Sequence, residues 1–156
     1  MDSPSDAQLA FRGLLQKLAD SIGAVPDSDL LADGHFLLVD GSLEIAILLH
    51  EPTASVRLNA PVAELAGDES VDFFRTLLDA NLFWAGTGGA TLSLEPVSNR
   101  IFLQDKMPLA ALEFPVLESW LSGFIEAARS WMLSLANLTG SAGGSGTVMP
   151  DPTATV

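Results

Sequence analysis

Two histidines and two glutamates are the side chains best suited to catalysis or metal binding in this sequence. His35 and His50 lie at opposite ends of an expected β-hairpin and approach each other across it, with Glu44 and Glu51 nearby. An imidazole beside a carboxylate can perform general acid–base chemistry, and two imidazoles can begin a metal site. No third ligand has a suitable spacing, and carboxylates on the solvent face of a sheet are usually just solvated. We therefore expect no catalytic residue and no metal site.

A glycine-rich segment, Gly86-Thr87-Gly88-Gly89, has the composition of a phosphate-binding loop. Such a loop precedes a helix, whose N-terminal amides bind the phosphate. Here the segment follows an expected helix, enters an expected strand and has no lysine near it. We interpret it as a connecting turn, and no serine lies in a nucleophile motif. The sequence thus indicates no cofactor.

The composition is that of one acidic globular domain. The chain has 156 residues, of which 48% are hydrophobic, and a formal net charge of -13. A charge of this sign repels nucleic acid and anionic lipid, so neither is an expected partner. The absence of cysteine excludes a disulfide framework, cysteine-ligated zinc and a thiol nucleophile. The acidic N-terminus lacks the features of a signal peptide, and no apolar run is long enough to span a bilayer, so we expect a cytoplasmic protein.

Hydrophobic periodicity predicts the order helix, three strands, helix, two strands, helix. This is an α+β arrangement with an antiparallel sheet. Segment 139–156 is rich in Gly, Ser, Thr and Pro, and we interpret it as a disordered tail behind a domain spanning 1–138. The first predicted elements are a helix capped by Ser3 or Ser5 and stopped by Gly23, a loop over 24–33, and strands over 36–39, 43–49 and 54–60, the last closed by Pro61. They are followed by a helix that begins at Asp68 or Glu69 and ends before Gly86, strands over 91–95 and 101–105, and a last helix that has Pro108 or Pro115 in its first turn.

The middle helix carries more apolar surface than a small monomer needs. Its apolar residues fall on two stripes, one formed by residues 74, 78 and 82 and the other by 73, 77 and 84. A helix at the surface of a small domain usually buries one stripe, so a partner subunit is the simplest cover for the second. The alternative is that all of these residues belong to the core.

Segment 77–96, whose sequence is LLDANLFWAGTGGATLSLEP, closely resembles the central motif of class I type III secretion chaperones, the Tir chaperone (CesT- and SycE-like) family. Three other segments are similar to that family: Leu38-Val39-Asp40-Gly41 before an apolar strand, Ile101-Phe102-Leu103-Gln104 before Met107-Pro108-Leu109, and a last helix with Phe124, Ala128 and Trp131. The resemblance covers about residues 5 to 136 and leaves the tail outside.

The resemblance implies an α-β-β-β-α-β-β-α fold with a twisted antiparallel sheet that forms a two-fold homodimer through the middle helix and the strand after it. It also implies binding of the N-terminal segment of a secreted effector in an extended form, which keeps the effector soluble and ready for export without nucleotide. The implied dimer residues are Phe73, Phe74, Leu77, Leu78, Leu82, Trp84, Leu92 and Leu94. The implied effector-binding residues are Phe11, Leu15, Leu18, Phe36, Leu38, Ile45, Ile47 and Val56, of which we expect about half to be ordinary core.

Two other functions remain open at this point. One is a small hydrolase that uses His35, His50 and nearby acids, and a clustered polar cleft would support it. The other is a regulatory anti-activator that sequesters another secretion component through the same surface. It would bind a different partner through the same kind of contact, so identification of the co-purified partner distinguishes the two functions.

Overall fold

The structure of the protein, a computed structural model, describes residues 3–142. Over these residues the predicted order of helices and strands is confirmed, with one short helix and three 3-10 turns added. Within the described residues no helix is both long and apolar enough to cross a membrane. The elements are α1 (Asp6–Ile22), α2 (Ser28–Ala32), β1 (His35–Asp40), β2 (Leu43–His50), η1 (Glu51–Thr53), β3 (Ser55–Glu64), α3 (Val71–Asn81), η2 (Leu82–Trp84), β4 (Thr91–Glu95), β5 (Arg100–Pro108), η3 (Leu109–Ala111) and α4 (Phe114–Ala142).

Helix α1 begins and ends at residues that the sequence had marked. Ser5 is its N-cap, and the Ser5 hydroxyl accepts a hydrogen bond from the Gln8 amide while the Gln8 side chain accepts one from the Ser5 amide. This capping box satisfies two amides that have no partner inside the helix. Gly23 ends the helix with φ 68°, a left-handed conformation in which glycine carries no steric cost.

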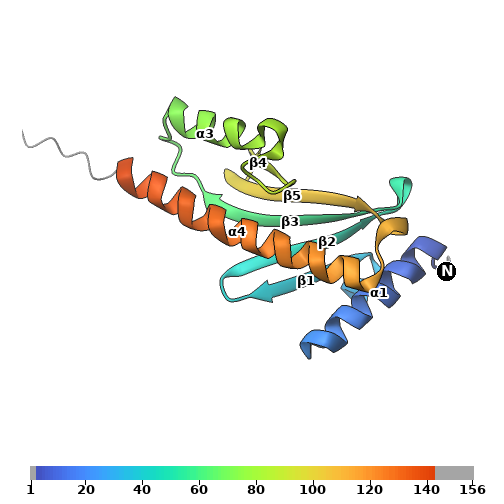
Figure 1. Ribbon diagram of the computed structural model, residues 1–156. Helices are drawn as coiled ribbons and strands as arrows, with labels where there is room; N and C mark the ends of the chain where they lie inside the picture. The colour runs from blue at the N-terminus through green and yellow to red at the C-terminus, as the bar shows by residue number, and fades with distance from the viewer. Residues whose placement is uncertain (1–2, 143–156) are drawn as a thin grey trace, which may run out of the picture.

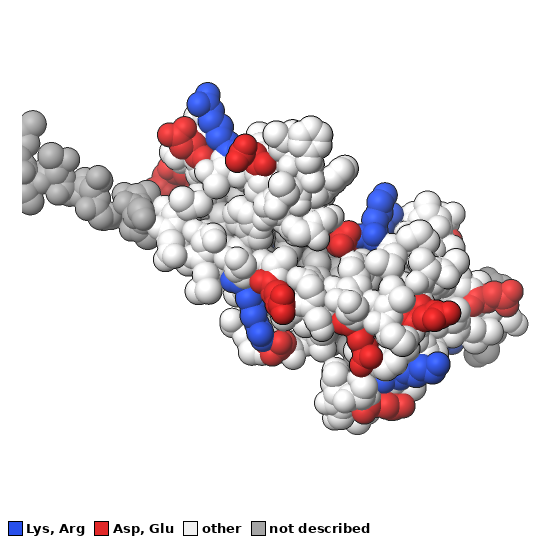
Figure 2. Space-filling model, viewed as in Figure 1, with Lys and Arg blue, Asp and Glu red and all other residues white. Residues whose placement is uncertain are grey.

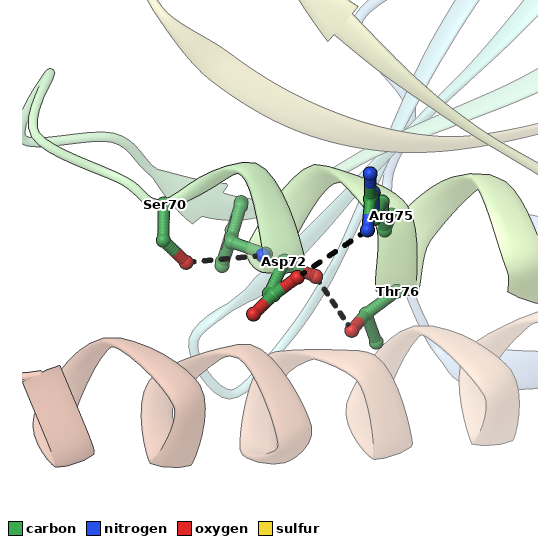
Figure 3. Close-up of polar contacts among 5 residues, drawn as sticks. Ser70, Asp72, Arg75 and Thr76 are labelled. Carbon is green, nitrogen blue, oxygen red and sulfur yellow. Dashed lines mark hydrogen bonds and ion pairs between the residues drawn. The ribbon is translucent and has the colours of Figure 1, made fainter.

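Two local predictions are wrong near α1 and α3. Segment 24–33 was expected to be a loop, but it contains α2, whose N-cap Asp27 accepts hydrogen bonds from the amides of Asp29 and Leu30. A helix of five residues is too short to show a periodicity. Helix α3 is capped by Ser70 rather than begun by Asp68 or Glu69, and the Ser70 hydroxyl accepts from the Phe73 amide (Figure 3).

Within residues 3–142 five strands form one antiparallel sheet in the order β1-β2-β3-β5-β4. The β1–β2 hairpin turns at Gly41, where φ is 64°, and Asp40 pairs with Leu43. Pro61 does not close β3, as was expected; the strand continues to Glu64 with a register irregularity between Pro61 and Ala63. The pairing of β2 with β3 stops at Asn59, so the missing amide hydrogen of Pro61 costs no ladder bond on that side.

One face of the sheet is covered by helices and holds the core. Helix α4 crosses this face, α1 packs beside its N-terminal end, and α3 lies over β4 at the far edge (Figure 1). The core residues alternate along the strands, as expected for a sheet with one buried face. The largest fully buried side chains include Ile45, Ile47, Leu58, Leu103, Leu117 and Leu135.

Helix α4 runs past the expected domain boundary at residue 138. Pro115 lies in its first turn, which needs no amide donor there, whereas Pro108 is the last residue of β5. The helix continues to Ala142, and within its last turns the Thr139 hydroxyl donates to the Leu135 carbonyl. The rest of the predicted disordered tail, residues 143–156, lies outside the described residues.

Candidate protein-binding surfaces

The two histidines form no reactive cluster in the structure. Pairing of His35 with Leu48 places it diagonally from His50 at the open end of the hairpin. His50 Nδ1 lies 2.7 Å from the Thr53 hydroxyl, and Glu44 and Glu51 are exposed. Within residues 3–142 no group of three or more potential ligands could hold a metal ion.

The glycine-rich segment is a turn that is fixed by packing. A Cβ at Gly86 would come within 2.9 Å of the Ala80 Cα and Cβ atoms, so the close approach of residue 86 to α3 requires glycine there. The Thr87 hydroxyl is buried and donates to the Ala90 carbonyl, and Trp131 Nε1 donates to the Gly86 carbonyl at 3.1 Å. These contacts make the segment a rigid connection between α3 and β4.

This connection displays two aromatic side chains. Phe83 and Trp84 both adopt left-handed φ, 53° and 54°, which is unfavourable for bulky residues. Their exposed fractions are 84% and 56%. Strained backbone that presents apolar side chains to solvent is typical of interaction sites.

Each of the two predicted apolar stripes has members that are at least partly buried and members that are exposed. Phe73 and Leu77 are in the core, whereas Leu78 is 70% exposed and Leu82 57% exposed. The charged side chains of this helix include Asp72 and Arg75, which lie 4.0 Å apart near its start (Figure 3). Uncharged atoms cover much of the lobe that α3 and η2 form above the sheet (Figure 2).

The implied dimer residues therefore divide between the core and this surface. Leu92 joins Phe73 and Leu77 in the core, and Phe74 is partly buried. The exposed members on α3, η2 and β4 are Leu78, Leu82, Trp84 and Leu94. We call these four residues and Phe83 the α3–β4 apolar patch.

The implied effector-binding residues lie almost entirely in the core of one chain. Leu38 is partly buried, and each of the others is at most 6% exposed: Phe11, Leu15, Leu18, Phe36, Ile45, Ile47 and Val56. Side chains with so little accessible surface stabilise the chain and do not contact a partner without rearrangement. The apolar run in β1 concealed this, because its residues are apolar on both faces and periodicity does not separate the faces.

The two edges of the sheet differ in whether they can accept another strand. At β4 the Asn81 side chain pairs with the backbone of Leu92 and occupies part of the edge. At β1 the Leu49 amide donates to the Gly34 carbonyl, so alternation along the ladder turns the backbone groups of His35, Leu37 and Val39 outward. Leu37 and Val39 are also 53% and 58% exposed. The β1 edge is thus both unpaired within the described sheet and apolar.

A groove separates α1 from the beginning of α4. Its volume is about 530 Å³, and its walls include Leu9, Gly13, Leu14, Leu112 and Phe114, with Lys17 and Glu113 at the rim. Gly13 widens the groove, since nothing lies within 4 Å of the position that its Cβ would take. The sequence alone did not reveal this groove, because η3 and α1 meet only in the folded chain.

The model of the Tir chaperone protein (CesT) family matches residues 13–132, and the chain therefore belongs to this family. Its members are type III secretion chaperones that bind effectors and are not enzymes. The protein is thus a secretion chaperone, which confirms the predicted class and removes the hydrolase alternative.

Solved structures show the same fold. The ExsC–ExsE complex matches with a TM-score of 0.69 and 20% identity over 82% of this chain and 95% of that chain. The HopA1–SchA chaperone–effector complex matches with a TM-score of 0.63 and 17% identity over 83% and 98%. The ExoU–SpcU complex from the type III secretion system of Pseudomonas aeruginosa matches with a TM-score of 0.60 and 14% identity over 79% and 94%. No curated protein matches the sequence.

Proposed function

We propose that this chaperone acts in the bacterial cytoplasm as a homodimer that binds the N-terminal segment of one effector in an extended form. Binding keeps the effector soluble and ready for export, and it consumes no nucleotide. The observation that carries the proposal is the unpaired, apolar β1 edge. An extended polypeptide can add to such an edge, because its amides and carbonyls find partners there.

The β1 edge offers two kinds of interaction at once. The outward backbone groups of Leu37 and Val39 supply hydrogen bonds, and their exposed side chains supply apolar contact. Backbone hydrogen bonds do not depend on the side chains of the partner, but they need its amides and carbonyls to be free. This edge therefore suits a partner that is unfolded over the bound segment. The opposite edge suits such a partner less well, because Asn81 already occupies the outward groups of Leu92.

The groove between α1 and α4 supports a second contact with the effector. Its walls are mostly apolar and its volume of about 530 Å³ suits one or two large apolar side chains. A bound segment that inserts such residues into the groove stays extended between the groove and the β1 edge. These contacts replace the implied residues of α1, which point into the core.

The α3–β4 apolar patch supports the dimer. Its members Leu78, Leu82 and Phe83 each expose more than half of their surface, which costs free energy in water unless another surface covers them. A second copy related by a two-fold axis presents the same three side chains, and the contact buries those of both copies. The net charge of -13 keeps such an assembly soluble while part of its apolar surface serves the effector.

Co-expression with the proteins encoded beside it tests the proposal. Size-exclusion chromatography with mass determination should find two copies of this chain with one effector, and protease treatment should leave the N-terminal segment of the effector protected. A monomer that captures none of these proteins would contradict both the dimer and the chaperone role proposed here. Recovery of a regulatory component instead of an effector would identify the anti-activator function.

A further inference from the structure

A trough crosses the sheet face opposite the main core, between the central strands and η2. Its volume is about 600 Å³. We call it the open-face trough, and the residues that matter here are Leu48, Arg57, Asn59, Trp84, Gln104 and Lys106. Arg57, Gln104 and Lys106 are exposed, so side chains from α1 or α4 do not cover them.

Two positive charges face each other in this trough. Arg57 and Lys106 are direct partners in the register of β3 and β5. Within residues 3–142 the ion pairs join Arg75 to Asp72 and Arg129 to Asp40, so neither trough cation has one. Like charges directly opposite one another on a sheet are destabilising. A carboxylate of a partner placed between them would attract both cations and outweigh their mutual repulsion.

The one carboxylate among the residues that line the trough, Asp105, is engaged by other groups. Asp105 points toward the helical layer, where its Oδ2 accepts from Trp120 Nε1 at 2.8 Å and its Oδ1 accepts from the Lys106 amide at 2.8 Å. The chain holds seven basic residues against twenty acidic ones. Two of the seven thus lie side by side without an ion pair, which concentrates positive charge on one part of an otherwise acidic protein.

Amide groups and an indole complete the lining of the trough. Ser93 Oγ donates to Gln104 Oε1 at 2.7 Å, and Gln104 Nε2 donates to Asn59 Oδ1 at 3.0 Å. This chain of hydrogen bonds orients the Asn59 amide with its oxygen engaged and its NH₂ group available as a donor. Trp84 adds an apolar wall, held in place by the strained η2 turn.

We propose that the open-face trough binds a short acidic segment of a polypeptide partner. One carboxylate lies between Arg57 and Lys106, and a neighbouring apolar side chain packs against Trp84. The segment is short, because the overall charge of -13 repels a long polyanion such as nucleic acid. The inference rests on the proposed function and deepens it, since it gives the charge that a bound effector carries at this contact.

Peptide titration of the full chain tests the inference. The probe is acetyl-Leu-Glu-Leu-Glu-Leu-amide, compared with the matched peptide in which glutamine replaces both glutamates. Nuclear magnetic resonance should show shifts at the side chains of Arg57, Lys106 and Trp84. The glutamate peptide should bind about tenfold more tightly at low salt, and added salt should remove the preference.

Two double variants make the test specific. R57Q/K106Q should lose the preference for the glutamate peptide, whereas R75Q/R129Q, which removes the same charge outside the trough and the groove, should keep it. Equal binding of the two peptides, or a preference that survives in R57Q/K106Q, would overturn the inference. Tighter binding of a DNA oligonucleotide than of the glutamate peptide at these residues would also overturn it. So would a halved molecular mass of R57Q/K106Q, because the two cations would then hold a dimer together instead of binding a peptide.

Effector capture separates this inference from the proposed function. If the unaltered chain captures no effector but keeps the peptide preference, the proposed function fails and the trough chemistry stands. If the unaltered chain and R57Q/K106Q capture effector equally well, and the unaltered chain shows no preference for the glutamate peptide, only the trough inference fails.

Discussion

The side-chain amide of Asn81 pairs with the backbone of Leu92 as a neighbouring strand would. Asn81 Nδ2 donates to the Leu92 carbonyl at 2.9 Å, and Asn81 Oδ1 accepts from the Leu92 amide at 2.8 Å. This pair of hydrogen bonds ties the end of α3 to β4 and occupies part of a sheet edge that could otherwise pair with another strand.

Replacement of Asn81 by alanine should therefore destabilise the chain. N81A leaves the partly buried amide and carbonyl of Leu92 without their partner, which costs about 1 to 3 kcal/mol. Urea denaturation measures the loss, and N59A, which removes one amide–amide contact on the open face, should cost less. Equal stability of N81A and the unaltered chain would show that water replaces the Asn81 amide without loss.

The β1 edge can be tested by proline substitution. L37P removes an outward amide hydrogen, so the chain should fold while its affinity for the captured effector falls at least about tenfold, as expected for lost backbone pairing. L38P removes an amide that points into the β1–β2 ladder and should destabilise the fold by about 3 kcal/mol or more. Thermal unfolding and effector co-purification measure the two effects. Full effector capture by folded L37P would exclude strand addition at this edge.

The proposed dimer predicts a specific effect at Leu78. This side chain is 70% exposed in one chain, so L78E should leave the fold of the protomer intact. In the dimer the same change buries an unpaired carboxylate, which costs several kcal/mol and should give a monomer. Light scattering reads the mass, and V25E, at a residue that is 96% exposed and outside the patch, is the control. A dimer that persists in L78E would place the interface elsewhere.

Two glycines should respond in opposite ways to alanine. In G86A the added methyl would meet the Ala80 backbone at 2.9 Å and force η2 away from α3, which should cost about 1 to 3 kcal/mol. G123A lies inside α4 with nothing within 4 Å and should gain about 0.5 to 1 kcal/mol from helix propensity. Chemical denaturation compares the two, and a neutral G86A would show that the turn has room to shift.

The sequence by itself determined the elements and the class of the protein. Periodicity, the Ser5 cap, the Gly23 stop and the apolar alternation of 43–49 act over a few residues, so they can be read without the fold. The motif over 77–96 carried the family, and the family match confirmed it. The short α2 was missed because five residues are too few to show a periodicity. The extension of β3 past Pro61 was missed because it depends on where the pairing with β2 ends, which the sequence does not show.

Only the tertiary structure decided which apolar residues remain exposed. Phe36 and Leu37 are neighbours of similar hydrophobicity, yet one is 6% exposed and the other 53%. The difference arises because successive side chains of a strand point to opposite faces and the helices cover one face only. The facing cations Arg57 and Lys106 are likewise far apart in sequence and meet through the register of β3 and β5. Composition set the amount of apolar surface and charge, whereas packing set where each is displayed.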